Sequence, residues 1–140
     1  MAFIKFAWEI FPALIDGLKV TLLLTAIGIA IGTVLGTVLA LGKIYGNLPV
    51  RWLTGSYIEI FRGTPLLVQL FILYYGLPAW GLRLTPLTAA IIGLGLNSGA
   101  YSAEYFRGAI QSINEGQMTA ARSMGLTKSK SVIYIIIPQD

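Results

Sequence analysis

Three long runs without a charged residue constrain this chain more than any other feature of its sequence. They cover residues 20–42, 63–82 and 84–103, and each holds 20 residues or slightly more. About 20 helical residues are needed to cross the ~30 Å hydrocarbon core of a membrane. The first run, TLLLTAIGIAIGTVLGTVLALG, lacks the polar stripe of a soluble helix. Only 11% of the residues are charged, against about 25% in ordinary soluble domains. The pattern predicts an all-α membrane protein with three transmembrane helices.

The basic residues are distributed unevenly between the two sides that three spans define. Three lie with the N-terminus and the turn at 82–86, and seven lie with the 43–62 loop and the 104–130 segment. The three are Lys5, Lys19 and Arg83, and the seven are Lys43, Arg51, Arg62, Arg107, Arg122, Lys128 and Lys130. Segments rich in Lys and Arg remain in the cytoplasm. We therefore expect the N-terminus outside, and the 43–62 and 104–130 segments inside.

The first 19 residues are less uniformly apolar than the three runs. Glu9 interrupts their hydrophobic stretch, and no small-residue cleavage site of the A-x-A type follows. This pattern favours an N-terminal segment over 1–19 that lies at the membrane interface, rather than a cleaved signal peptide.

Glycines in the first span predict close helix packing. Gly28, Gly32 and Gly36 recur every four residues, so they share one helix face. Small residues on one face allow a second membrane helix to approach closely. The sequence does not identify that second helix.

The region after the third span predicts two further helices. The third helix has no breaker before Ile113, so we expect it to continue into the cytoplasm up to that residue. Asn114 and Gln117 fit an N-cap and its capping-box partner, and Gly125 fits the left-handed position that ends a helix. Thr127 can cap the next helix, and the apolar run 132–137 predicts the start of a fourth span over 131–140.

Several polar residues lie within or beside the predicted spans. Asn97, Tyr101 and Glu104 share one face of the third helix, and Gln69 carries the amide side chain in the second span. Polar groups that face lipid are costly, so this face is predicted to turn inward. The four residues are candidates for a polar substrate pathway. The alternative is hydrogen bonding between helices, with Glu104 paired to Arg107.

A second ion pair is expected just before the second span. Glu59 and Arg62 lie three residues apart in YIEIFRGTP, which favours an interfacial salt bridge. An exposed pair of this kind contributes well under about 1 kcal/mol.

The composition gives little support to an enzyme. The chain has no Cys and no His, which removes thiol catalysis and the commonest zinc ligand and general base. Neither a phosphate-binding Walker A loop nor a paired carboxylate set is present. A channel would show rings of charge or a filter loop, and neither is seen. We expect no metal site and no nucleic-acid partner.

Three motifs resemble the permease subunits of ABC importers that depend on a binding protein. EGQMTAARSMGLTKSKSVIYIIIPQ is similar to their EAA loop, with Ala120, Ala121, Gly125, Ile136 and Pro138 in the matching places. YIEIFRGTPLLVQLFILYYGLP and GAYSAEYFRGAIQSINEGQ resemble the branch that imports polar amino acids such as histidine, glutamate, glutamine, arginine and opines. The match covers nearly the whole chain from about Gly17 onward.

The resemblance implies a type I ABC-importer permease fold over 20–140 and a role in amino-acid import across the bacterial inner membrane. The EAA loop implies a cytoplasmic coupling helix that docks on an ABC ATPase. The coupling residues would be Glu115, Gly116, Gln117, Thr119, Ala120, Ala121 and Gly125. Other implied partners are an extracytoplasmic amino-acid-binding protein, a second permease copy or paralogue, and membrane lipid. The partner ATPase binds the ATP, so this chain is expected to hold no cofactor.

The chain departs from the family pattern in two places. Thr119 stands where the family has Glu, so the charged contact usual there is missing. The family has five spans, whereas this chain stops within the fourth. We therefore expect a truncated permease. The alternative function is a membrane scaffold that does not transport.

Overall fold

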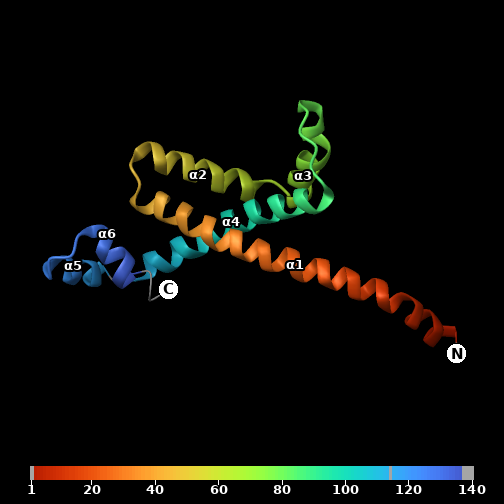
Figure 1. Cartoon of the computed structure of the whole chain (residues 1–140). Coiled ribbons are helices and arrows are strands. Elements are labelled where there is room, and N and C mark those ends of the chain that lie inside the picture. The colour runs from red at the N-terminus through yellow and green to blue at the C-terminus, as the bar shows by residue number, and fades with distance from the viewer. Residues whose placement is uncertain (1, 114, 137–140) are drawn as a thin grey trace.

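The computed structural model describes residues 2–113 and 115–136, and every regular element in these ranges is helical (Figure 1). The elements are α1 (Ala2–Tyr45), α2 (Leu48–Gly63), α3 (Leu66–Phe71), η1 (Ile72–Gly76), η2 (Leu77–Trp80), α4 (Pro86–Ser112), α5 (Glu115–Ser123), α6 (Lys128–Ser131) and η3 (Val132–Ile136). In Figure 1, α1 crosses α4, α2 folds back beside them, and α3 stands away at an angle. The short helices α5 and α6 follow the C-terminal end of α4.

Helix α1 is one uninterrupted helix and contains the first predicted span. Its stretch Trp8–Tyr45 is long and apolar enough to cross a membrane. The separate segment expected over 1–19 is not set off by any break in the helix. Pro12 lies within α1, and the helix continues past Glu9 because a single charge does not stop helix propagation. Composition therefore changes near residue 19, but backbone conformation does not.

The segment 43–62, expected to be a loop, contains helix α2. Asn47 caps it by accepting the N–H of Val50 at 3.2 Å, and Pro49 follows in the first turn, where its missing N–H costs little. Thr54 and Ile58, four residues apart, are buried. The Asn-x-Pro start and this spacing are the sequence signals that predict the helix. The helix was not predicted because the search for spans relied on uncharged runs, and α2 carries charged residues among its apolar ones.

A sharp bend separates α2 from the remainder of the second predicted span. Thr64 is extended, with φ −109° and ψ 138°, because a residue that precedes proline avoids the helical region. Pro65 then begins a new helical stretch, and Leu66–Trp80 is bent by 101° from α2. The two helices are apolar enough for a membrane only when taken together. The span expected over 63–82 is therefore the second arm of a bent pair.

Helix α4 contains the third predicted span and continues beyond it. Thr85 caps its start, Pro86 occupies its first position, and the helix ends at Ser112 with Ile113 as C-cap. The predicted continuation towards Ile113 is confirmed. Among the described helices, α4 does not reach the hydropathy of a membrane span taken alone. Asn97 and Tyr101, in the second half of the predicted span 84–103, lower the apolar character of the helix.

Helices α1 and α4 form the most extensive helix pair of the fold, through glycines on both sides. A Cβ atom added to Gly36 would lie 2.5 Å from Cβ of Ser102 and 3.0 Å from the backbone N of Ala103. One added to Gly99 of α4 would lie 2.6 Å from Cδ2 of Leu35. The partner that the glycine pattern left open is therefore α4.

This close contact between α1 and α4, the glycine seam, predicts that substitutions at two glycines of α1 differ in their effect on stability. Gly36→Ala should destabilise the chain by about 1–3 kcal/mol, because the added methyl meets the backbone of α4. Gly28→Ala is the matched control, since its Cβ would lie 3.9 Å from the nearest atom, Cβ of Leu94. Both changes favour the helix equally. Thermal unfolding in detergent checks this, and equal midpoints for the two variants would contradict the seam.

Candidate functional site

A buried amide node holds the bend between α2 and α3. Gln69 Nε2 donates to the carbonyls of Phe61 (2.9 Å) and Thr64 (3.1 Å), and lies 2.7 Å from Oγ1 of Thr64. Asn97 Nδ2 of α4 donates to the Phe61 carbonyl and to Oε1 of Gln69, both at 3.3 Å. The two amides therefore satisfy carbonyls at the end of α2, where helical partners are lacking. Both side chains are occupied by contacts within the fold.

A carboxylate at the middle of the fold gathers cations from three helices. Glu104 of α4 accepts from Lys43 Nζ of α1 at 2.8 Å and from Arg107 Nη2 at 2.8 Å. Arg62, at the end of α2, has Nη1 3.9 Å from Glu104 Oε2. The predicted Glu104–Arg107 pair is confirmed. The expected Glu59–Arg62 pair is wrong in the described part of the chain, where Arg62 pairs with Glu104 instead.

The cations around Glu104 change its acidity. Glu104 lies one residue past the predicted span 84–103. The hydrogen bond from Arg107 is the main cause that lowers the pKa of Glu104 from 4.5 to about 2, with Lys43 adding to it and partial burial opposing it. A carboxyl whose pKa falls on folding stabilises the fold at pH values above 4.5, and the contribution disappears as the pH drops towards 2. The ion pairs are therefore intact at neutral pH.

The four candidate pathway residues gather at one place, around the end of α2. Gln69 and Asn97 share the amide node, and the ring of Tyr101 lies under the guanidinium of Arg62, 5.3 Å from ring centroid to Cζ. Tyr101 is 41% exposed, whereas Gln69 is buried. Contacts between helices, one of the two alternatives, are what the structure shows for Asn97. The roles of Lys43 and Arg62 were missed, because no local pattern links residues so far apart in sequence.

Helix α5 is a short helix with a defined end. Gly125 has φ +85°, the left-handed conformation that Gly tolerates best, as the sequence predicted. The N–H of Leu126 donates to the Ala121 carbonyl at 3.2 Å, and the N–H of Gly125 donates to the Arg122 carbonyl at 3.0 Å. This pattern is a Schellman motif. The predicted N-cap, Asn114, lies outside the described residues.

The two adjacent alanines of α5 have different environments. Ala121 is 2% exposed and packs inward, whereas Ala120 is exposed. Ser131 and Val132, on the helices that α5 contacts, are also buried. Gly116, Gln117 and Thr119 are exposed. The outward face of α5 therefore contains Ala120, whereas Ala121 lies on the buried side of a helix that contacts α6 and η3.

Helices α5 and α6 contact each other and form the α5–α6 hairpin. Thr127 caps α6 by accepting the N–H of Lys130 at 3.4 Å, as predicted. Lys128 Nζ lies 5.0 Å from the ring centroid of Tyr45, at the end of α1. This cation–π contact links the hairpin to α1. Among the described residues, no group of three or more acidic, Cys or His residues could hold a metal ion.

The charge cluster predicts that neutralising Glu104 lowers the stability of the fold, by an amount that depends on pH. Glu104→Gln should lower stability by about 1–3 kcal/mol, because three cations lose their shared partner. The loss should be constant above pH 4.5 and shrink below it, as the wild-type carboxyl becomes protonated. Glu59→Gln, at an exposed carboxyl, is the control and should change little. Thermal unfolding at several pH values is the measurement, and a loss that grows on acidification would contradict the assignment.

The chain matches one protein family over most of its length. Residues 28–139 match the family described as binding-protein-dependent transport system inner membrane component. The probable amino-acid ABC transporter permease protein YckA of Bacillus subtilis is 44% identical over 136 residues, which are 97% of this chain and 60% of that protein. The glutamine transport system permease protein GlnP of Escherichia coli is 38% identical over 133 residues, 94% of this chain and 61% of that protein. The chain thus spans about 60% of the length of these relatives.

Solved structures agree on the fold. A crystal structure of an amino acid ABC transporter with histidines superposes with a TM-score of 0.84 at 44% identity, covering 94% of this chain and 61% of that chain. An inward-facing MetNI methionine ABC transporter superposes with a TM-score of 0.64 at 25% identity, covering 94% of this chain and 59% of that chain. The chain therefore belongs to the inner-membrane components of binding-protein-dependent transport systems, and its helices have the arrangement of an ABC-transporter permease.

Proposed function

We propose that this chain is the membrane-spanning part of an ATP-driven importer subunit for a polar amino acid. The support is the family match and the names of the relatives, several of which are amino-acid permeases. An ABC ATPase on the cytoplasmic side, an amino-acid-binding protein outside and a second permease copy or paralogue would complete the importer. The ATPase would bind ATP, and this chain would hold no cofactor.

In the proposed topology, α1 and α4 cross the membrane in the same direction. Spans 20–42 and 84–103 both run inward, with the N-terminus outside, and the bent pair α2 and α3–η2 connects them. Lys43 follows the first span and Glu104 follows the third, and their side chains meet at 2.8 Å. Two residues proposed to lie at the cytoplasmic ends of their spans are thus neighbours. The stretch from 131 would begin a fourth span.

The observation that carries the coupling role is the exposed outer face of α5. This nine-residue helix directly follows α4 and is closed by Gly125. Small side chains such as Ala120 let a partner surface approach, in the manner of a helix that enters a groove. Glu115, Gly116, Gln117 and Thr119 lie on the same helix and would contribute to the contact. Thr119 would give a neutral contact in place of the family's Glu.

The packing gives a path for motion from α5 into the membrane. A push on α5 would reach α6 and η3, which α5 contacts, and would reach the end of α1 through Lys128 and Tyr45. Helices α1 and α4 would then move together, because the glycine seam leaves no room for sliding. The force would arrive at the Glu104 cluster, where α2 joins the pair.

The pathway proposal distinguishes among the four polar residues. Gln69 uses its amide on backbone carbonyls, so we propose that it positions the bend. Asn97 donates to the Phe61 carbonyl as well, and to Oε1 of Gln69, so it would hold α4 to that bend. Tyr101 is exposed and is the residue proposed to contact substrate. Glu104 would hold Lys43, Arg62 and Arg107 in place and would not contact substrate itself.

A bulky side chain on the outer face of α5 tests the coupling role. Ala120→Trp should reduce the ATPase recovered with the affinity-purified chain by about fivefold or more, because a clash of about 1 kcal/mol changes binding by that factor. Leu53→Trp is the control, since Leu53 is 75% exposed and belongs to α2, which lies apart from α5 in Figure 1. The bound ATPase is quantified by mass spectrometry of material purified from the host membrane.

Folding of the variant is checked separately. Hydrogen exchange of the α5 amides should be unchanged in Ala120→Trp, because residue 120 is exposed. Wild-type recovery of the ATPase with Ala120→Trp would show that this face of α5 is not the docking surface.

A further inference from the structure

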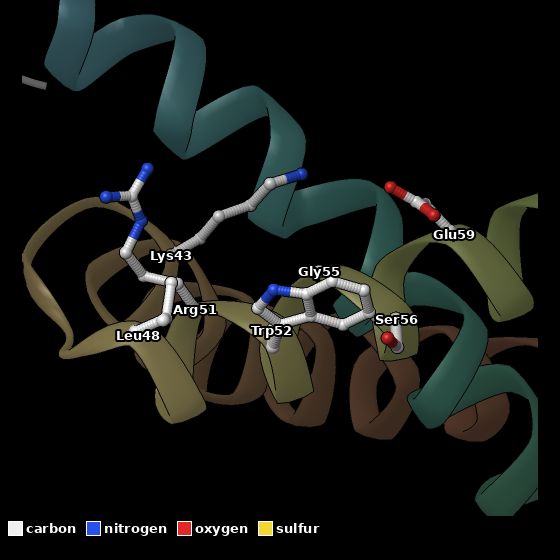
Figure 2. Close-up of a pocket in the computed structure, with 7 residues that line it drawn as sticks. All are labelled: Lys43, Leu48, Arg51, Trp52, Gly55, Ser56 and Glu59. Atoms are coloured by element: carbon white, nitrogen blue, oxygen red, sulfur yellow. The ribbon is translucent and has the colours of Figure 1, made fainter.

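A pocket of about 400 Å³ lies beside the turn that joins α1 and α2. Lys43 of α1 contributes to it, and the other lining residues are Leu48, Arg51, Trp52, Gly55, Ser56 and Glu59 of α2. Figure 2 shows Arg51 at one end of the pocket and Glu59 at the other, with Lys43 and Trp52 between them. The amide node and the outer face of α5 contribute no residue to it.

The charges of the pocket favour an anion at one end. Lys43 already donates to Glu104 at 2.8 Å and shares that carboxylate with Arg62 and Arg107. The guanidinium of Arg51 has no hydrogen bond or ion pair within residues 2–113 and 115–136. Glu59 disfavours an anion at the opposite end. A single phosphate group would therefore bind next to Arg51, which can donate two parallel hydrogen bonds to it.

The surface around the pocket is apolar. Leu48, Trp52 and Leu53 are 71%, 72% and 75% exposed. A soluble surface seldom exposes such residues together, whereas Trp is enriched where lipid headgroups meet acyl chains. The pocket thus combines a cation without a partner, an indole and apolar side chains within two turns of one helix.

We propose that this pocket binds the headgroup of an anionic phospholipid such as phosphatidylglycerol. Arg51 contacts the phosphate, Trp52 packs against the glycerol backbone, and Leu48 and Leu53 contact the upper acyl chains. The cytoplasmic leaflet supplies anionic lipid, and basic pockets beside membrane helices on that side select it. The proposal rests on the membrane topology and does not depend on the transport function.

The experiment follows the fluorescence of Trp52. Trp8→Phe and Trp80→Phe leave Trp52 as the single tryptophan of the three in the chain. The protein, in a neutral detergent, is titrated with phosphatidylglycerol spin-labelled near the headgroup. Phosphatidylcholine with the same label and acyl chains is titrated in parallel. Phosphatidylglycerol should half-quench Trp52 at a several-fold lower mole fraction than phosphatidylcholine.

Two arginine variants distinguish binding at this pocket from a general effect of the protein's positive charge. Arg51→Gln should raise the half-quenching mole fraction of phosphatidylglycerol about fivefold, because one basic residue contributes about 1 kcal/mol near an anionic surface. Arg83→Gln removes the same charge at an exposed position outside the pocket and should leave the titration unchanged. Equal quenching of wild type and Arg51→Gln would overturn the proposal.

Inorganic phosphate distinguishes a lipid site from a site for soluble anions. Millimolar phosphate should leave quenching by phosphatidylglycerol nearly unchanged, because the lipid gains the apolar contacts that free phosphate lacks. Full reversal of quenching by phosphate would overturn the lipid assignment. Equal quenching by the two spin-labelled lipids would also overturn it, since the pocket would then select acyl chains and not charge.

Discussion

The close packing of α1 on α4 through glycine is the constraint on which the rest of the structure depends. Gly36 lets the backbone of α4 approach at Ser102 and Ala103, and Gly99 makes room for Leu35 in return. No hydrophobic driving force holds helices together inside lipid, so close van der Waals contact must do so. This approach also sets the depth at which Lys43 meets Glu104, one residue after Ala103.

Two polar groupings then place α2 against the pair. The amide node contributes neutral hydrogen bonds, each worth about 1 kcal/mol net, whereas loss of a buried partner costs about 1–3 kcal/mol. The Glu104 cluster adds charge-assisted bonds, which are roughly twice as strong as neutral ones. The bend at Thr64 and Pro65 needs both groupings, because proline interrupts the helix and leaves carbonyls of α2 without helical donors. Gln69, Asn97 and Glu104 therefore stabilise the arrangement of the helices, whether or not they also contact a substrate.

Local features of the sequence predicted much of this structure. The uncharged run over 20–42 lies within α1, and Gly125 and Thr127 end and begin helices as expected. The α2 helix was missed because the spans were predicted from uncharged runs, and α2 contains charged residues. The bend was missed because Thr64-Pro65 was interpreted as the first turn of a straight span. The partners of Glu104 come from positions distant in sequence, and such pairing depends on the fold. The burial of Ala121 likewise depends on the packing of α5 in the fold, which the EAA pattern does not encode.

The central claim is that α4 runs inward and presents the α5–α6 hairpin to the cytoplasm. The chain has no cysteine, so single cysteines report on it cleanly. Ser129→Cys lies at an exposed position of α6, and Arg83→Cys lies in the exposed turn before α4. A membrane-impermeant maleimide added to intact cells or spheroplasts should label residue 83 and not residue 129, and inverted vesicles should show the reverse. Labelling of residue 129 from outside would contradict the account.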